Sequence, residues 1–258
     1  MTPLDPSFLK IPLAHRALHD VAGGRPENSR AAIRAAIQAG YGIEIDLQMS
    51  KDAQAMVFHD YDLSRLARAD GLVANRSAAE LAEISLIGTD EGIPNLQEIL
   101  DLVAGQVPLL IELKDQDGHL GRNIGPLETA TAMLLEAYQG PVAVMSFNPH
   151  SVAKMAALCP QVTRGLVTGA FAHTDWSSVA PKTCDHLRNI PDYERVQASF
   201  ISHQVQDLSR ERVAELKSNG ADILCWTVTS AEIEAEARKI AQNITFEQYL
   251  PKLPVHPA

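Results

Sequence analysis

Short apolar runs alternate with longer amphipathic segments along the chain. The apolar runs predict β-strands at residues 11–15, 41–47, 55–59, 107–113, 142–146, 162–167, 198–201, 222–227 and 243–246. The amphipathic and alanine-rich segments predict helices at residues 29–39, 78–84, 96–103, 129–138, 149–158, 209–218 and 231–241. The first of these helices is expected to end at Gly40, because glycine is common just after a helix.

Strands that are apolar throughout are typical of a parallel sheet covered by helices on both faces. Seven or eight strand–helix units follow one another without a linker, which favours a closed (β/α)₈ TIM barrel over an open doubly wound sheet. The glycine-rich phosphate loops that are frequent in open sheets do not occur in the sequence. We therefore predict an α/β protein in which residues 1–258 form a single TIM-barrel domain, with its core at about residues 10–250.

The overall charge narrows the class of ligand. The chain has 258 residues and a formal net charge of -10, which disfavours binding to nucleic acid or to an anionic membrane surface. A small anionic substrate is still compatible with this charge, because a metal ion or a few cations can reverse the field inside one cleft.

The cellular environment is predicted from three further features. Cys159, Cys184 and Cys225 lack the C-x-x-C spacing of a zinc site, which favours reduced structural thiols. No apolar run approaches the ~18 residues of a membrane span, and the N-terminus lacks the apolar core of a secretory signal. We expect a cytoplasmic protein without stable membrane insertion.

Polar residues collect at the predicted strand ends, where a parallel barrel carries its functional groups. These residues are His15, Arg16, Glu44, Asp46, His59, Asp60, Glu112, Lys114 and Trp226. Glu44 and Asp46 point to the same face of their strand, because side chains alternate along a strand. Inward carboxylates from Glu44, Asp46 and Glu112 would repel one another unless they were protonated or bound a cation. One hard divalent ion, Mg²⁺ or Ca²⁺, suits these oxygen ligands better than zinc does.

Each of these patterns also has an ordinary explanation. An E-x-D pair occurs at solvated strand edges, an E-x-K pair forms salt bridges, and Trp226 is equally well explained as a core residue. Their joint occurrence at successive strand ends is what favours a functional site.

The chain resembles the glycerophosphodiester phosphodiesterase family, which belongs to the phospholipase C-like phosphodiesterase TIM barrels. The motifs occur in order over nearly the whole chain as LAHR (Leu13–Arg16), RPENS (Arg25–Ser29), IEIDL (Ile43–Leu47), MVFHDYDLSRLARADGLV (Met56–Val73), IELK (Ile111–Lys114), SFNP (Ser146–Pro149) and CWTVTS (Cys225–Ser230). The resemblance implies a TIM barrel and hydrolysis of a small-molecule glycerophosphodiester to sn-glycerol 3-phosphate and an alcohol.

The resemblance also implies a role for each strand-end residue. Glu44, Asp46 and Glu112 would bind the divalent metal ion, and Arg16 and Lys114 would neutralise charge on the phosphoryl oxygens. The acid–base pair would be His15 and His59, and which of them is the base is left open. Trp226 and Glu27 would contact the substrate. The resemblance further implies that a neighbouring substrate hydroxyl attacks phosphorus and gives a cyclic phosphate, which water then opens.

Several other residues are expected to support this site. Asp60 is a candidate partner that orients a catalytic histidine, and Arg65 a structural anchor for the loop after His59. Asn28 is expected to fix the loop after the first strand, and the polar segment Lys114–Glu128 to form a rim over the pocket. The remaining histidines lack a predicted strand-end position and are expected at the surface or in the core; they are His119, His150, His173, His186, His203 and His256.

The chain departs from the family pattern at three places. Ala17 occupies a position where the family usually has glycine, and His19 is an additional histidine in the following loop. Residues 243–251 replace a TDxP-like segment of many members. With these differences, the resemblance does not indicate which alcohol is the leaving group.

Two other functions are compatible with the same residues. A phospholipase-like lyase would stop at the cyclic phosphate and would require an apolar rim that faces lipid. A non-catalytic barrel would bind phosphate or metal without turnover. The sequence predicts no oligomeric state.

Overall fold

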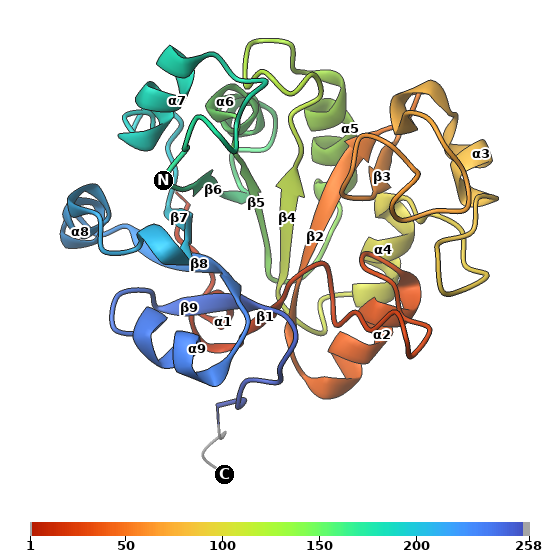
Figure 1. The fold of residues 1–258 in the computed structure, drawn as a ribbon, viewed down its shortest axis with the longest axis horizontal. Helices are drawn as coiled ribbons and strands as arrows, with labels where there is room; N and C mark the ends of the chain where they lie inside the picture. Colours follow the sequence, from red (N-terminus) through yellow and green to blue (C-terminus); the bar gives the residue numbers. More distant parts are fainter. Residues whose placement is uncertain (1, 255–258) are drawn as a thin grey trace.

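The strands form one closed barrel. The computed structural model describes residues 2–254 (Figure 1). In that range eight parallel strands follow one another around the barrel, which is closed because β1 pairs with both β2 and β9. These strands are β1 (Leu13–Ala14), β2 (Gly42–Met49), β4 (Leu109–Leu113), β5 (Val142–Ser146), β6 (Thr163–Thr168), β7 (Phe200–Gln204), β8 (Asp222–Val228) and β9 (Asn243–Phe246). The predicted (β/α)₈ TIM barrel is confirmed.

Helices surround the barrel (Figure 1). They are α1 (Ser7–Lys10), α2 (Arg30–Ala39), α3 (Ala78–Ala82), α4 (Leu96–Val103), α5 (Pro126–Leu135), α6 (Pro149–Leu158), α7 (Pro181–Arg188), α8 (Glu211–Ser218) and α9 (Ala231–Ala237), with short 3₁₀ turns η1 (Val73–Asn75) and η2 (Val205–Asp207). The ends of α2 follow from its sequence: the Ser29 side chain accepts a hydrogen bond from the amide of Ala32, and Gly40 ends the helix at φ 80°. None of the helices within residues 2–254 is long and apolar enough to cross a membrane.

Side-chain alternation divides the core into two layers. Ile43 and Ile45 of β2 face outward and pack in one cluster with helix residues such as Ile33 and Leu96. Leu110 of β4 faces inward, in a second cluster with Phe200 and other interior residues. Glu44 pairs with Leu110 across the β2–β4 ladder, and this register places Glu44 on the inner face.

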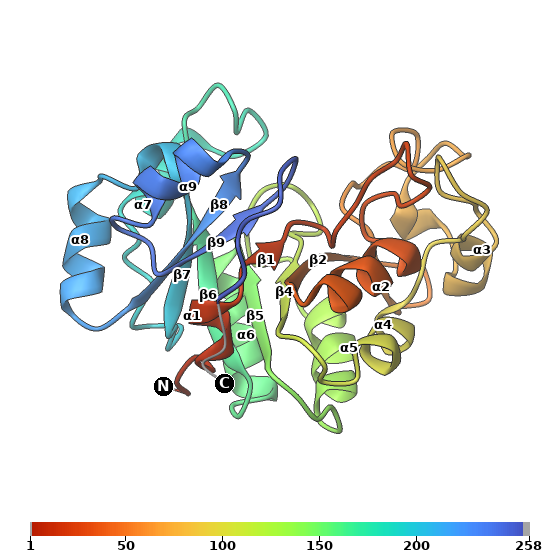
Figure 2. The same ribbon diagram turned by 90° about the horizontal axis from the view of Figure 1, so that it is seen from below.

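Helix α1 closes the amino end of the barrel, and Figure 2 shows it beside the starts of the central strands. Phe8 of α1 is buried in the interior cluster. The side-chain amide of Asn243, the first residue of β9, donates hydrogen bonds of 2.7 Å to the carbonyl oxygens of Phe8 and Ile11. Since α1 closes this end, the polar groups at the carboxyl ends of the strands are the ones that open to ligands.

Several predicted elements differ from the structure. The segment 55–59 contains β3 (Ala55–Val57), which pairs antiparallel with β2 outside the parallel barrel. Helix α5 begins at Pro126, three residues before the predicted start, because Glu128 accepts a hydrogen bond from the Gly125 amide and Pro126 suits the first helical turn. Helix α7 was not predicted, because only Cys184 and Leu187 of its residues are buried and the apolar stripe is too weak to detect.

The view that His203 has no strand-end position is wrong. β7 continues to Gln204, so His203 lies on the strand, fully buried. Its ring is bound by the Thr168 hydroxyl at 2.8 Å and by Asp207 at 3.2 Å, which makes it the core histidine that was one of the two expected outcomes. His256 lies outside the described residues. Cys159, Cys184 and Cys225 are free and buried, as expected.

Candidate active site

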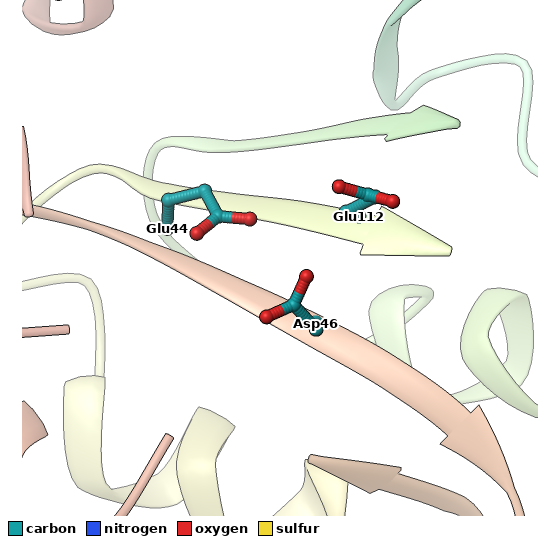
Figure 3. A group of neighbouring side chains, drawn as sticks. All are labelled: Glu44, Asp46 and Glu112. Carbon is teal, nitrogen blue, oxygen red and sulfur yellow. The ribbon is translucent and has the colours of Figure 1, made fainter. Parts of the chain in front are cut away.

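Three carboxylates meet at the inner face of the barrel (Figure 3). Glu44 and Asp46 come from β2 and Glu112 from β4, and the strand register sets Asp46 beside Glu112. One oxygen atom from each of the three lies within 4.8 Å of the other two, and all three residues are buried. The structure therefore brings together the three carboxylates that strand alternation placed on one face.

Two cations and two amide groups hold this triad. The Lys114 ammonium lies 2.8 Å from Asp46 Oδ1 and 2.8 Å from Glu112 Oε1. Arg16 contributes its backbone amide to Glu44 Oε2 at 2.9 Å, and its Nε lies 3.6 Å from Asp46 Oδ2. The side-chain amide of Asn28 donates to Asp46 Oδ2 at 2.9 Å.

The charges of the triad are not fully balanced. Burial and the nearby charges of Asp46 and Glu112 raise the pKa of Glu44 well above its ordinary range. Burial also opposes ionisation of Asp46, but Lys114, His59 and Arg16 outweigh it and lower the pKa of Asp46. Three carboxylates thus face two permanent cations, and Glu44 is the one whose ionised form is disfavoured. A hard cation with oxygen ligands fits this donor set.

Each candidate catalytic histidine is anchored by a carboxylate. His15 Nδ1 lies 2.7 Å from Glu247 Oε2, and His59 Nδ1 lies 2.6 Å from Asp60 Oδ1. A carboxylate only accepts hydrogen bonds, so Nδ1 carries the proton in both rings and Nε2 is left for the cavity. Burial lowers the pKa of His15, although the hydrogen bond that its ring donates to Glu247 acts in the opposite direction.

The anchor of His59 belongs to a longer chain of ion pairs. Arg65 donates to Asp60 at 2.7 Å and to Glu27 at 2.9 Å, and Glu27 also binds Arg16 at 3.0 Å. The expectation that Asp60 contacts a catalytic histidine and that Arg65 anchors its loop agrees with these contacts. Glu27 lies in the loop as expected, and its carboxylate is occupied by two arginines.

One cavity of about 130 Å³ joins these groups. It is lined by His15, Arg16, Glu44, His59, Glu112, Lys114, Met145, Phe147, Val167, Trp226, Thr227 and Thr245. The lining is polar on the side of β1, β2 and β4 and largely apolar on the side of β5, β6 and β8. Trp226 belongs to the apolar side, where its ring meets Phe147 edge to face at 5.5 Å and its Nε1 donates to the Ser202 carbonyl oxygen.

Two expected positions, and the additional histidine His19, are not part of the cavity lining. Glu27 is set back behind Arg16. His19 does not reach the cavity and lies with Nε2 3.6 Å from Glu247 Oε2. Of the segment Lys114–Glu128, which was expected to form a rim, only Lys114 lines the cavity, and residues 119–122 border a separate groove.

Sequence reasoning missed Glu247. Glu247 directly follows β9 and is therefore a strand-end residue. An acidic side chain at a strand end is the feature of the sequence that could have identified it as part of the site. It lies in the segment 243–251, which replaces the TDxP-like motif of many family members.

The departure at Ala17 has a structural consequence. Ala17 is buried and adopts φ 65°, in the left-handed region that favours glycine. Its amide donates to the Glu44 carbonyl oxygen at 2.9 Å, so this backbone conformation joins the loop after β1 to the strand that carries the triad. Glycine in other members of the family would adopt this conformation with less strain.

Comparison with known proteins adds an independent line of support. A profile of the glycerophosphoryl diester phosphodiesterase family matches residues 15–245. The chain belongs to this family. It is therefore a phosphoric diester hydrolase, and the resemblance recognised from the motifs is confirmed.

The family relationship extends to individual proteins. YhdW of Bacillus subtilis (strain 168) is 28% identical over 233 residues, which cover 87% of this chain and 88% of that protein. A glycerophosphodiester phosphodiesterase of Caldanaerobacter subterraneus subsp. tengcongensis is 25% identical over 217 residues, or 80% of this chain and 82% of that protein. An Oleispira antarctica phosphodiesterase, solved in complex with the product sn-glycerol-3-phosphate, has a TM-score of 0.76 at 25% identity and covers 93% of both chains.

Proposed function

We propose that this enzyme hydrolyses glycerophosphodiesters to sn-glycerol 3-phosphate and an alcohol with one divalent metal ion and two histidines. The observation that carries the proposal is the meeting of a buried carboxylate triad, two cations and two carboxylate-anchored histidines at one small cavity. The product in the Oleispira antarctica relative supports sn-glycerol 3-phosphate as the product class.

Glu44, Asp46 and Glu112 are the residues that would hold the metal ion, Mg²⁺ or Ca²⁺. Their charge excess and their oxygen donors fit such an ion. When bound, the ion supplies Lewis-acid polarisation of a phosphate oxygen and neutralises negative charge.

Arg16 and Lys114 bind the phosphate and stabilise charge that develops on it. Both line the cavity, and both are fixed before substrate arrives, Arg16 by Glu27 and Lys114 by Asp46 and Glu112. Such preorganised cations cost no rearrangement when charge grows in the transition state. Glu27 acts on the substrate through Arg16, whose guanidinium it positions.

His15 and His59 move the protons. One ring nitrogen accepts the proton of the attacking hydroxyl, and the other ring protonates the departing alkoxide. The two Nε2 atoms are the available positions, because Glu247 and Asp60 occupy the Nδ1 atoms. Trp226 and Phe147 bound the apolar side of the cavity, where they receive the carbon backbone of the glycerol and exclude water.

The test is release of sn-glycerol 3-phosphate from glycerophosphodiesters with choline, ethanolamine, glycerol and inositol leaving groups, with and without EDTA. We expect activity that EDTA abolishes and that Mg²⁺ or Ca²⁺ restores. Glu44→Gln and His15→Gln should each lose about 100-fold or more in kcat, while Glu211→Gln, an exposed residue of α8, should retain activity. Full metal-dependent activity in Glu44→Gln would overturn the proposal.

An activated leaving group separates the acid from the base. A p-nitrophenyl ester of glycerol phosphate needs little protonation of its leaving group, so replacing the acid should cost much less activity with it than with glycerophosphocholine. We compare His15→Gln and His59→Gln on both substrates. Equal losses for both variants on both substrates would contradict a division of roles between the two rings.

The same preparation tests the two alternative functions. Phosphorus NMR of the products shows a persistent cyclic phosphate if the enzyme is a lyase, and a transient one or none before sn-glycerol 3-phosphate if it is a hydrolase. A barrel that only binds phosphate or metal would give no turnover with Mg²⁺, Mn²⁺ or Ca²⁺.

A further inference from the structure

A second groove lies between α6 and α7 and is lined by basic side chains. Its volume is about 540 Å³, and the basic residues are His119, Arg122, His150, Lys182, His186 and Arg195. They come from the loop after β4, from the first turn of α6, from the first and last turns of α7, and from the turn after α7. This groove is several times larger than the catalytic cavity and has a different chemistry.

The groove carries a local excess of positive charge in an acidic protein. Arg122, Lys182 and Arg195 face a single carboxylate, that of Asp192, whereas the whole chain has a net charge of -10. Asp192 is engaged by His186 at 2.9 Å and by Arg195 Nε at 2.6 Å. The side chains of Arg122 and Lys182 form no hydrogen bond or ion pair with any residue of the range 2–254.

The surrounding structure positions the backbone segments that carry these cations. The Asn148 side chain donates to the Gly121 carbonyl oxygen at 2.8 Å and so fixes the loop that carries Arg122. His150 and Lys182 lie in the first turns of α6 and α7, whose backbone amides add partial positive charge at the same place. Burial, followed by the positive charges of Arg122 and Arg195, lowers the pKa of the His150 side chain.

The groove is separate from the catalytic cavity. The two share no lining residue. An apolar cluster that includes Leu120, Phe171 and Leu187 packs between them, with Leu120 and Leu187 bordering the groove and Phe147 bordering the catalytic cavity. A ligand in the groove would therefore not occupy the position of the substrate.

We propose that this groove binds a phosphate monoester dianion. Three cations against one carboxylate leave a surplus of two charges, which matches a dianion better than a singly charged phosphodiester. Two arginines and a lysine offer the forked and single donors that terminal phosphate oxygens accept. The concave shape and the acidity of the remaining chain favour a small anion over an extended polyanionic surface.

Two sources of this ligand chemistry exist, inorganic phosphate and sn-glycerol 3-phosphate. The test titrates each into the full chain in EDTA and follows the imidazole of His150 by NMR, with dimethyl phosphate as the singly charged comparison. Binding should raise the pKa of His150, because the dianion offsets Arg122 and Arg195 and adds to the effect of Asp192; His186 is the other titrating group that faces the ring. A preference for sn-glycerol 3-phosphate over inorganic phosphate identifies the organic ester as the ligand, and equal affinity identifies the phosphate group alone.

The matched variants are Arg122→Gln/Lys182→Gln in the groove and Arg68→Gln/Lys252→Gln at exposed positions elsewhere, which remove the same charge. The first pair should weaken binding about tenfold or more, and the second should change it little. An unshifted His150 titration, or equal weakening by both pairs, would overturn the proposal. Binding of vesicles of phosphatidylcholine and phosphatidylglycerol in equal parts, without binding of either soluble monoester, would also overturn it in favour of a membrane surface.

Discussion

Glu247 Oε2 lies 2.7 Å from His15 Nδ1, which joins the segment after the last strand to the end of the first. The hydrogen bond from His15 and the nearby ring of His19 lower the pKa of Glu247, so its carboxylate is ionised at neutral pH. This charge fixes the orientation and the tautomer of the His15 ring, as carboxylate partners of catalytic histidines do. We assign Glu247 a positioning role.

Glu247→Gln should therefore lower kcat by about 10- to 100-fold while KM for glycerophosphodiesters changes little. The amide keeps the size of the side chain but removes the charge that supports the Nδ1–H tautomer. The measurement is the steady-state release of sn-glycerol 3-phosphate, with Glu247→Asp as the conservative variant that should recover part of kcat. An unchanged kcat in Glu247→Gln, or a loss confined to KM, would show that His15 does not depend on this carboxylate.

Strand alternation was sufficient to predict the triad. Once a parallel barrel is assumed, Glu44 and Asp46 must share a face, and Glu112 lies one residue before the end of the next parallel strand. The contact of Glu247 with His15 could not be predicted in this way, because it depends on barrel closure, which pairs β9 with β1 over a long separation in sequence. The basic groove was equally inaccessible, because its basic residues come from two loops and two helices whose relative positions no local pattern encodes.

The extent of β7 was underestimated for a related reason. The apolar run ends at Ile201, and the predicted strand therefore did not include the polar residues Ser202, His203 and Gln204. The structure buries His203 because Thr168 and Asp207 satisfy both ring nitrogens, so hydrogen bonding replaces hydrophobicity as the reason for burial.

This buried histidine should make stability depend on pH. Burial lowers the pKa of His203 below the ordinary value of 6.5, so the unfolded chain binds its proton more readily than the folded chain. The free energy of unfolding should then fall as the pH decreases through the unfolded pKa toward the folded one. Urea unfolding at a pH above and a pH below 6.5 measures the effect.

His203→Gln isolates the contribution of this residue from that of other histidines. The variant should be less stable than wild type by about 1–3 kcal/mol at the higher pH, because a hydrogen-bonded buried ring is lost, and the difference should shrink at the lower pH. A difference that is the same at both pH values would mean that His203 titrates alike in the folded and unfolded chains. His173→Gln, at an exposed position, is the matched control.

Gly165 of β6 provides space for an aromatic ring inside the barrel. A Cβ atom at this position would overlap the ring of Phe200 on the neighbouring strand. Gly165→Ala should lower the free energy of unfolding by about 1–3 kcal/mol, as overpacking of a filled core does. Combining it with Phe200→Leu should cost less than the sum of the two single substitutions. Additive losses in urea unfolding would show that the two residues do not compete for the same space.

The unbalanced charge of the triad predicts opposite effects of one substitution with and without a divalent ion. The pKa of Glu44 is raised in the folded chain, so its carboxylate opposes folding above the unfolded pKa, and this opposition grows as the pH rises toward the folded pKa. In EDTA near neutral pH, Glu44→Gln should therefore be at least as stable as wild type.

With Mg²⁺ or Ca²⁺ in large excess over Kd the order of stability should reverse, because a ligand at 100 times Kd stabilises wild type by about 2.7 kcal/mol and the variant has lost a donor. Thermal unfolding of both proteins in EDTA and in each ion makes the comparison without reference to activity. If Mg²⁺ and Ca²⁺ stabilised wild type and Glu44→Gln equally, or stabilised neither protein, the carboxylates of Glu44, Asp46 and Glu112 would not be a metal site.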